Sequence, residues 1–87
     1  MAERLPPPPF WRTLYYEFRA SVRSDRRDIE PNYVQHVIDQ PTRREIQADG
    51  RFRLWGYVME RQRWLRVIVE PDGETVHNAF WDRKFRP

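Results

Sequence analysis

The chain has 87 residues, which suffices for one domain with one small core and is too short for a deep cleft between two lobes. It contains no cysteine, so disulfide bonds and thiolate metal sites are excluded. The net charge is only +3, but fifteen of the sixteen basic residues are arginine, and four tryptophans accompany them.

Arginine binds phosphate bidentately and stacks on flat rings, so this composition favours RNA or another phosphate-bearing partner. A GC-rich genome would also replace lysine with arginine, and a net charge of +3 is far from the dense basic stripe of a dedicated nucleic-acid binder. Both interpretations stay open. No segment has the length and apolar character of a signal peptide or a membrane span, so we expect a cytoplasmic protein without a membrane partner.

Residues 1–11 are expected to form a proline-rich arm, followed by a single domain over residues 12–87. Pro6 to Pro9 predict a polyproline II segment that joins neither a helix nor a strand ladder. The arm then serves as a short spacer or as a ligand for a protein partner, and Phe10 and Trp11 are placed to pin it onto the domain.

Residues 12–29 carry two overlapping patterns. Apolar residues alternate with polar ones from Tyr16 to Val22, which is the strand period. Phe18, Val22 and Ile29 also fall near one helical stripe. We expect a strand to about Phe18, followed by a short helix.

The following segment predicts a helix of about ten residues. Pro31 suits the first turn, where its missing N–H costs nothing, and apolar residues then recur at helical spacing from Tyr33 to Ile38. Pro41 ends the helix because it excludes the α conformation from the residue before it.

The rest of the chain predicts an antiparallel meander. Asp49-Gly50 is a strong hairpin signal, and Pro71-Asp72-Gly73 is a second turn with its own mechanism. The strands are expected at residues 43–48, 51–60, 63–70 and 74–81. The predicted class is therefore α+β, with one or two short helices packed on one face of a four- to five-stranded, mostly antiparallel sheet.

The central hairpin is expected to have two unlike faces. A two-residue turn at Arg61-Gln62 places Tyr57 opposite Arg66 and Trp55 opposite Ile68, with small apolar residues on the reverse. The face opposite the small apolar residues is aromatic and basic, as in a sheet that stacks RNA bases. It carries Arg51, Arg53, Trp55, Tyr57, Trp64 and Arg66. Cross-strand aromatic and Arg–Glu pairs also stabilise sheets without any ligand, so a purely structural role stays open.

The face occupied by His77 depends on the turn before it. A two-residue turn at Asp72-Gly73 puts Val76, Asn78 and Phe80 in the core and His77 beside Arg66. A three-residue loop reverses every side chain and turns His77 toward the helices. The hydrophobic pattern favours the first arrangement, and the turn chemistry favours the second.

His77 is the candidate for proton transfer on a strand, because a histidine near its ordinary pKa can serve as acid or base. Arg66 is expected to stabilise phosphate charge, with Asp82 or Glu70 orienting a donor, so the predicted catalytic set is His77, Arg66 and Asp82. A half-buried strand histidine that is simply hydrogen-bonded is the alternative. The residues expected to contact RNA are Arg27, Arg51, Arg53, Trp55, Tyr57, Trp64 and Arg83.

No metal or other cofactor is expected. The two histidines are far apart, and neither a His-x-x-x-His spacing nor a paired-aspartate spacing occurs. His36 is expected to be a packing or surface residue of the helix.

The order of the motifs resembles the small toxin-like domains of the barnase–EndoU–colicin–RelE group, which includes RelE-type and BrnT-type toxins. The helix ends in VIDQP, DGR leads into a strand, LRVIVE follows, and the last strand ends in NAFWDR. Relatives place Arg-x-Ile before the second helix, matched by residues 27–29, and end on Thr-Ala-Phe-x-Asp-Arg, matched by residues 78–83. The likeness covers about residues 14–83. One position departs from it: Arg19 stands where relatives commonly have a histidine.

This resemblance implies a RelE-like fold and, in active members, metal-independent RNA cleavage on the sheet face away from the helices. It also favours a helix over residues 19–27. On this resemblance we expect a bacterial toxin-like endoribonuclease, as one half of a toxin–antitoxin pair, with RNA and an antitoxin-like protein as partners. The alternatives are a non-catalytic module that binds RNA or protein, and an adaptor that uses the proline arm.

Overall fold

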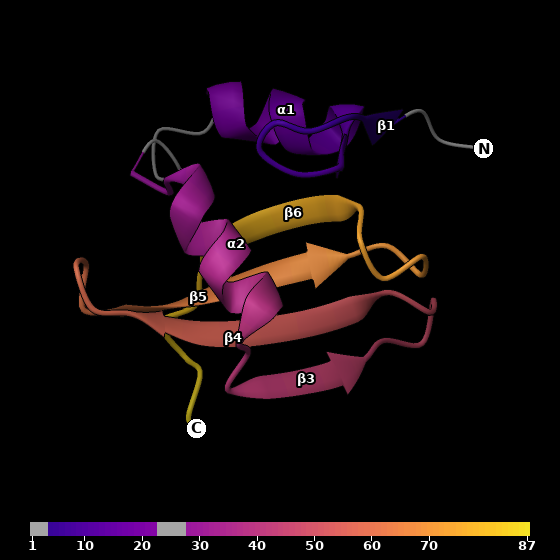
Figure 1. The fold of residues 1–87 in the computed structure, drawn as a ribbon. Coiled ribbons are helices and arrows are strands. Elements are labelled where there is room, and N and C mark those ends of the chain that lie inside the picture. The colour runs from indigo at the N-terminus through magenta and orange to yellow at the C-terminus, as the bar shows by residue number, and fades with distance from the viewer. Residues whose placement is uncertain (1–3, 23–27) are drawn as a thin grey trace.

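A computed structural model describes residues 4–22 and 28–87. The protein is α+β, with two helices and a six-stranded mixed sheet of order β1-β2-β6-β5-β4-β3 among the described residues. In Figure 1, α2 lies across one face of the central strands, and α1 lies beyond β6 on the side of β1 and β2. The predicted class is confirmed, but the sheet has one strand more than the expected four or five.

The extra strand comes from the N-terminal arm. Strand β1 (Arg4–Leu5) pairs antiparallel with β2 (Arg12–Thr13), and Arg12 of β2 pairs in parallel with Val76 of β6. The prolines lie in the loop between these two short strands and outside the ladder, as expected, but the Pro7–Pro8 and Pro8–Pro9 peptide bonds are cis, so the expected polyproline II conformation is not formed. Phe10 is buried in the core, so the arm is fastened to the domain at the predicted residue.

Helix α1 (Leu14–Val22) replaces the predicted strand to Phe18. Thr13 explains its start, because the Thr13 hydroxyl accepts a 3.0 Å hydrogen bond from the Tyr16 N–H, as an N-cap residue does. Tyr16 packs its ring edge against Phe10, while Leu14 and Phe18 remain exposed. The alternating pattern was thus misleading, since Phe18, in the middle of the alternation, does not enter the core.

Helix α2 (Pro31–Asp39) confirms the predicted helix. Pro31 occupies the first turn, and Tyr33, Val34 and Val37 are buried against the sheet. A glycine lies opposite: a Cβ atom on Gly56 would stand 2.8 Å from Cγ2 of Val37. Gly56 therefore allows α2 to approach the strands closely.

Strands β3 (Arg43–Ile46), β4 (Phe52–Val58), β5 (Arg63–Val69) and β6 (Val76–Trp81) form the predicted meander. Gly50 has a φ of +91° in the β3–β4 loop, and Gly73 has a φ of +79° in the β5–β6 loop. Both turn predictions placed glycine where the backbone is left-handed.

The pairing of β4 with β5 differs from the expectation by two residues. Trp55 lies opposite Arg66 and Tyr57 opposite Trp64, because the connecting loop spans Met59 to Gln62 and has four residues instead of two. An even shift keeps each side chain on its face. The two unlike faces are therefore as predicted, although the cross-strand neighbours are not.

Neither expected arrangement of β6 is correct, because the strand contains a bulge. Val69 pairs with Val76 and Ile68 pairs with Asn78, which leaves His77 as an extra residue. Val76 and Ala79 are buried under the helices, whereas Phe80 lies opposite Arg66 on the other face. The expected contact of His77 with Arg66 is therefore wrong.

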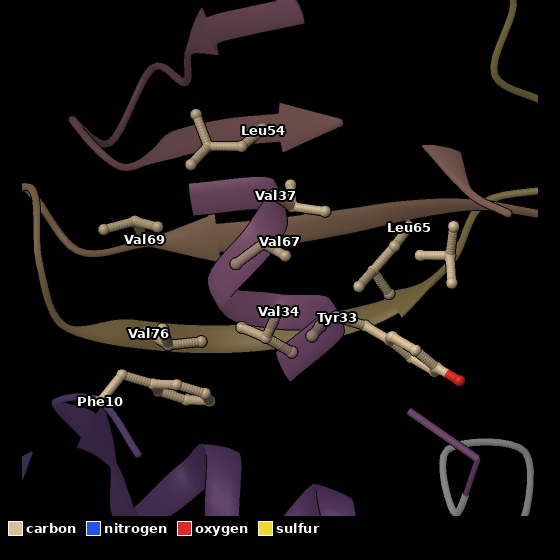
Figure 2. Packing of buried hydrophobic residues seen from close by; sticks show 11 residues of the cluster. Phe10, Tyr33, Val34, Val37, Leu54, Leu65, Val67, Val69 and Val76 are labelled. Atoms are coloured by element: carbon tan, nitrogen blue, oxygen red, sulfur yellow. The ribbon is translucent and has the colours of Figure 1, made fainter. Parts of the chain in front are cut away.

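The core lies between α2, the inward side of β4 to β6, and Phe10. Figure 2 shows Val37 of α2 near Val67 and Leu54 of the sheet, and Val34 over the strand that carries Val76. Several of these side chains are fully buried, and each contributes about 1.5–3 kcal/mol relative to an exposed position. The helix-covered side is called the helix face below, and its reverse the outer face.

Candidate functional site

The outer face carries the predicted aromatic and basic side chains. Arg66 lies across the rings of Trp55 and Phe80, with its guanidinium carbon 5.2 and 5.0 Å from their centroids. Tyr57 meets Trp64 edge to face at 5.3 Å. The structure therefore brings Trp55, Tyr57, Trp64 and Arg66 together on two adjacent strands, and Phe80 of β6, which was expected in the core, joins them.

Asp82 is the anchor at the C-terminal end of β6. Its Oδ2 atom accepts hydrogen bonds from Trp55 Nε1 at 2.9 Å and from Arg66 Nη2 at 2.9 Å. Burial opposes ionisation, but the hydrogen bonds from Trp55 and the Lys84 N–H, with the charge of Arg66, lower the pKa of Asp82. Asp82 and Arg66 are therefore neighbours, but they hydrogen-bond to each other.

The C-terminal residues cover the centre of the outer face. The Phe85 ring stacks on Trp55 at 4.9 Å with an interplanar angle of 16°, and it lies 4.9 Å from Trp64. Arg43 of β3 contacts the Phe85 ring at 5.2 Å. Trp55 is consequently only 4% exposed, whereas Tyr57 is 40% exposed. In this conformation Tyr57 is accessible for base stacking and Trp55 is not.

His77 belongs to a second cluster, at the opposite end of β6. Its Nδ1 atom lies 2.8 Å from Oε1 of Glu70, and the Arg51 Nε–H donates to both Glu70 oxygens at 3.1 and 3.2 Å. Tyr15 of α1 stacks on the imidazole at 4.7 Å with an interplanar angle of 12°. His77, Glu70, Arg51 and Tyr15 are called the histidine cluster below.

The electrostatics of this cluster favour neutral imidazole. Burial lowers the pKa of His77, and the positive charge of Arg51 lowers it further, while Glu70 only partly offsets both effects. Nδ1 is close to Glu70 but forms no hydrogen bond of good geometry. A neutral ring beside a carboxylate is suited to accept a proton, because Glu70 then stabilises the imidazolium that forms.

The other predicted residues are dispersed. Arg53 is half-buried opposite Glu45 of β3, and Arg83 is exposed in the C-terminal segment. Arg27 lies outside the described residues. His36 is exposed on α2, in agreement with a surface position.

Three contributors were missed or left undecided by the sequence. Tyr15 was missed because its segment was assigned to a strand, and Phe85 because it lies beyond the last predicted strand. Glu70 was named only as an alternative to Asp82. Its position just after a strand and seven residues before His77 is compatible with contact across a hairpin, once the loop length is known.

Among the residues described, no group of three or more His, Asp and Glu side chains is arranged to hold a metal ion. Within the same ranges, no helix has the length and apolar character needed to cross a membrane. Two of the surface cavities lined by described residues have volumes of about 310 and 260 Å³. The first lies between α2 and the β4–β5 loop, and the second lies at the ends of β5 and β6.

Comparison with known proteins adds no relative. No family model matches the chain, and neither does any curated protein or solved structure.

Proposed function

We propose that this protein is a metal-independent endoribonuclease of the toxin-like kind, with a RelE-like fold. The observation that carries the proposal is the histidine cluster: a neutral histidine, a carboxylate and an arginine gathered at one end of the sheet. Those three groups supply a base, a stabiliser of the protonated base, and a cation for phosphate.

The reaction needs few groups. His77 takes the proton of the ribose 2′-hydroxyl, and the 2′-oxygen forms a bond to the adjacent phosphorus. The bond from phosphorus to the 5′-oxygen breaks, and that oxygen receives a proton from water. The products are a 2′,3′-cyclic phosphate and a 5′-hydroxyl end.

The charges of the cluster fit these steps. Glu70 stabilises the imidazolium formed on His77, at the 2.8 Å separation of Nδ1 and Oε1. Arg51 is the phosphate-binding cation of the proposal because it lies in the same cluster as His77 and its charge acts on that residue. Its Nε is engaged by Glu70 and its Nη1 by Asp49 at 2.9 Å, so the phosphate is expected to approach the Nη2 group. The roles first expected for Arg66 and Asp82 therefore pass to Arg51 and Glu70.

Purified protein incubated with an end-labelled, unstructured RNA tests the proposal. We expect wild type to produce cyclic phosphate ends in the presence of EDTA, and His77→Ala to lose cleavage by about 10²–10⁴-fold. His36→Ala is the matched control and should cleave normally, because His36 is an exposed residue of α2. An intact substrate with wild type, or equal cleavage by wild type and His77→Ala, would contradict the proposal.

The second candidate is a non-catalytic module that binds RNA through the same outer face. The exposed ring of Tyr57 and the cation–aromatic pairs around Arg66 favour it. It predicts RNA binding by wild type without cleavage. An antitoxin-like partner and a cytoplasmic location accompany the first candidate as further predictions.

A further inference from the structure

We infer that the cavity at the ends of β5 and β6 binds one unpaired nucleobase of the RNA. The inference rests on the proposed endoribonuclease and adds a substrate-binding site away from the histidine cluster. The cavity has a volume of about 260 Å³. It is lined by Gln62, Arg63, Trp64, Trp81, Asp82 and Arg83.

Two indole rings form the aromatic part of this cavity. Trp64 of β5 and Trp81 of β6 lie on neighbouring strands but on opposite faces of the sheet, because Trp81 pairs with the buried Leu65. Both line the cavity at the strand ends, near the 2.9 Å backbone hydrogen bond from the Asp82 N–H to the Trp64 carbonyl. Stacking of one base on an aromatic ring contributes about 1–3 kcal/mol and tolerates any base. The volume lies just below the roughly 300–1,000 Å³ of sites for drug-sized ligands, which suits a single planar ring.

Residues outside the cavity hold both indoles in place. Trp81 Nε1 donates a 2.9 Å hydrogen bond to Oδ1 of Asp28. Trp64 contacts Tyr57 at 5.3 Å and Phe85 at 4.9 Å. A site with pre-positioned walls loses little conformational freedom when a ligand enters.

The polar groups of the cavity suit a base that carries a phosphate. The Gln62 amide offers both a donor and an acceptor to a base edge. Arg83 is exposed and can reach a phosphate. Arg63 has 45% of its side chain exposed, but it is paired with Asp28 at 3.5 Å and lies over the Trp81 ring at 5.5 Å. The Asp82 carboxylate is already engaged by Trp55 and Arg66, which leaves the cavity with a positive balance.

The spacing relative to the histidine cluster favours single-stranded RNA. Trp81 lies four residues beyond His77 on β6, which corresponds to roughly 13 Å along a strand. A short single strand can span that distance while one of its bases enters the cavity. A paired base cannot enter, because its partner and neighbours keep it stacked.

The probes for this site are the four ribonucleoside 5′-monophosphates, which cannot be cleaved by the proposed reaction. The readout is the indole N–H resonances of ¹⁵N-labelled protein at each of the four tryptophans. We expect the Trp64 and Trp81 signals to shift and to saturate, while the signal of Trp11 in the N-terminal arm stays in place. Unmoved Trp64 and Trp81 signals at saturating nucleotide would overturn the inference.

Two matched variants distinguish nucleotide binding in the cavity from general electrostatic attraction of the nucleotide to the basic C-terminal residues. Arg83→Gln should weaken nucleotide binding by roughly two- to fivefold, because it removes an exposed cation beside the cavity. Arg86→Gln removes an exposed cation that does not line the cavity and should leave binding unchanged. Equal weakening by both variants would argue against the cavity.

The same experiments distinguish this inference from the proposed function. Shifted tryptophan signals with intact RNA would support the cavity and contradict the endoribonuclease. Cleaved RNA with unshifted signals would do the reverse. His77→Ala should keep the shifts, since His77 lies outside the cavity.

Discussion

His77 is held in its neutral form by burial and by the charge of Arg51, against the opposing effect of Glu70. Its pKa is therefore lower in the folded protein than the ordinary 6.5 expected in the unfolded chain. As the pH falls below 6.5, the unfolded chain takes up the proton first, and the free energy of unfolding decreases until the lowered pKa is passed. Above 6.5 the residue contributes no pH dependence.

The lowered pKa of His77 predicts a difference in pH dependence between two proteins. Between pH 7.5 and 5.5, wild type should lose more stability than His77→Gln, as measured by urea unfolding at each pH. The two proteins differ only at residue 77, so the difference between their pH profiles isolates that residue. Parallel pH profiles would show that His77 is not desolvated in solution. RNA cleavage should likewise persist to slightly below pH 6.5 and then fall as the base becomes protonated.

Asp82 carries a prediction at the same scale. Asp82→Asn keeps the size of the side chain but removes the charge that pairs with Arg66. The new amide N–H₂ group can also face the N–H donors of Trp55 and Arg66, with which it cannot form a hydrogen bond. We expect a loss of about 1–3 kcal/mol in the free energy of unfolding by urea denaturation. The control is Asp39→Asn, an exposed carboxylate on α2, which should change stability by less than about 0.5 kcal/mol. Equal effects of the two substitutions would contradict the anchoring role of Asp82.

Among the elements, the C-terminal segment after β6 is unusual because an aromatic ring from it covers another aromatic ring on an otherwise open sheet face. Phe85 is 9% exposed and lies on Trp55. Phe85→Ala should destabilise the fold by about 2–4 kcal/mol and should shift the tryptophan emission to longer wavelength as Trp55 meets water. Arg86→Ala is the control and should leave both quantities unchanged. An unshifted spectrum would mean that Phe85 does not shield Trp55.

The elements also show how far the sequence could be interpreted. Helix α2 and the four long strands were predictable because proline, glycine and the hydrophobic period all agree there. Helix α1 was not, since its start depends on a Thr13 hydroxyl bond and its exposed apolar residues imitate a strand. The predicted faces of β4 and β5 survived an error of two residues in register, because an even shift preserves the alternation.

Across the whole molecule, the site could be predicted only in part. The aromatic and basic face followed from local alternation. The histidine cluster did not, because it joins Tyr15, Glu70 and Arg51, which are far apart in sequence and meet only through the bulge, a hairpin and the placement of α1. The short parallel pairing of β2 with β6 likewise joins the two ends of the chain.

The charge distribution of the whole molecule gives a further prediction. Several arginines are already paired with carboxylates, and the net charge is only +3. The affinity for single-stranded RNA should therefore fall as the salt concentration rises. The logarithm of the binding constant should fall by roughly 0.7 per neutralised phosphate for each tenfold rise in salt, and we expect about two or three phosphates to be neutralised. Fluorescence anisotropy between low and physiological salt measures this slope. A flat dependence would favour a protein ligand over RNA.

The bulge in β6 has a consequence for how the chain tolerates changes in length. Without His77, the sequence from Val76 to Trp81 still alternates correctly, because Val76 and Ala79 remain inward and Asn78 remains opposite Ile68. Deleting one residue from a central strand normally reverses every side chain beyond the deletion. Here, removing His77 should leave a regular, folded strand, whereas removing Ala79 should not. The alternation of faces along β6 therefore does not require His77, whose contacts are with the segment before it: Tyr15 stacks on its ring and the Thr13 hydroxyl donates to its carbonyl.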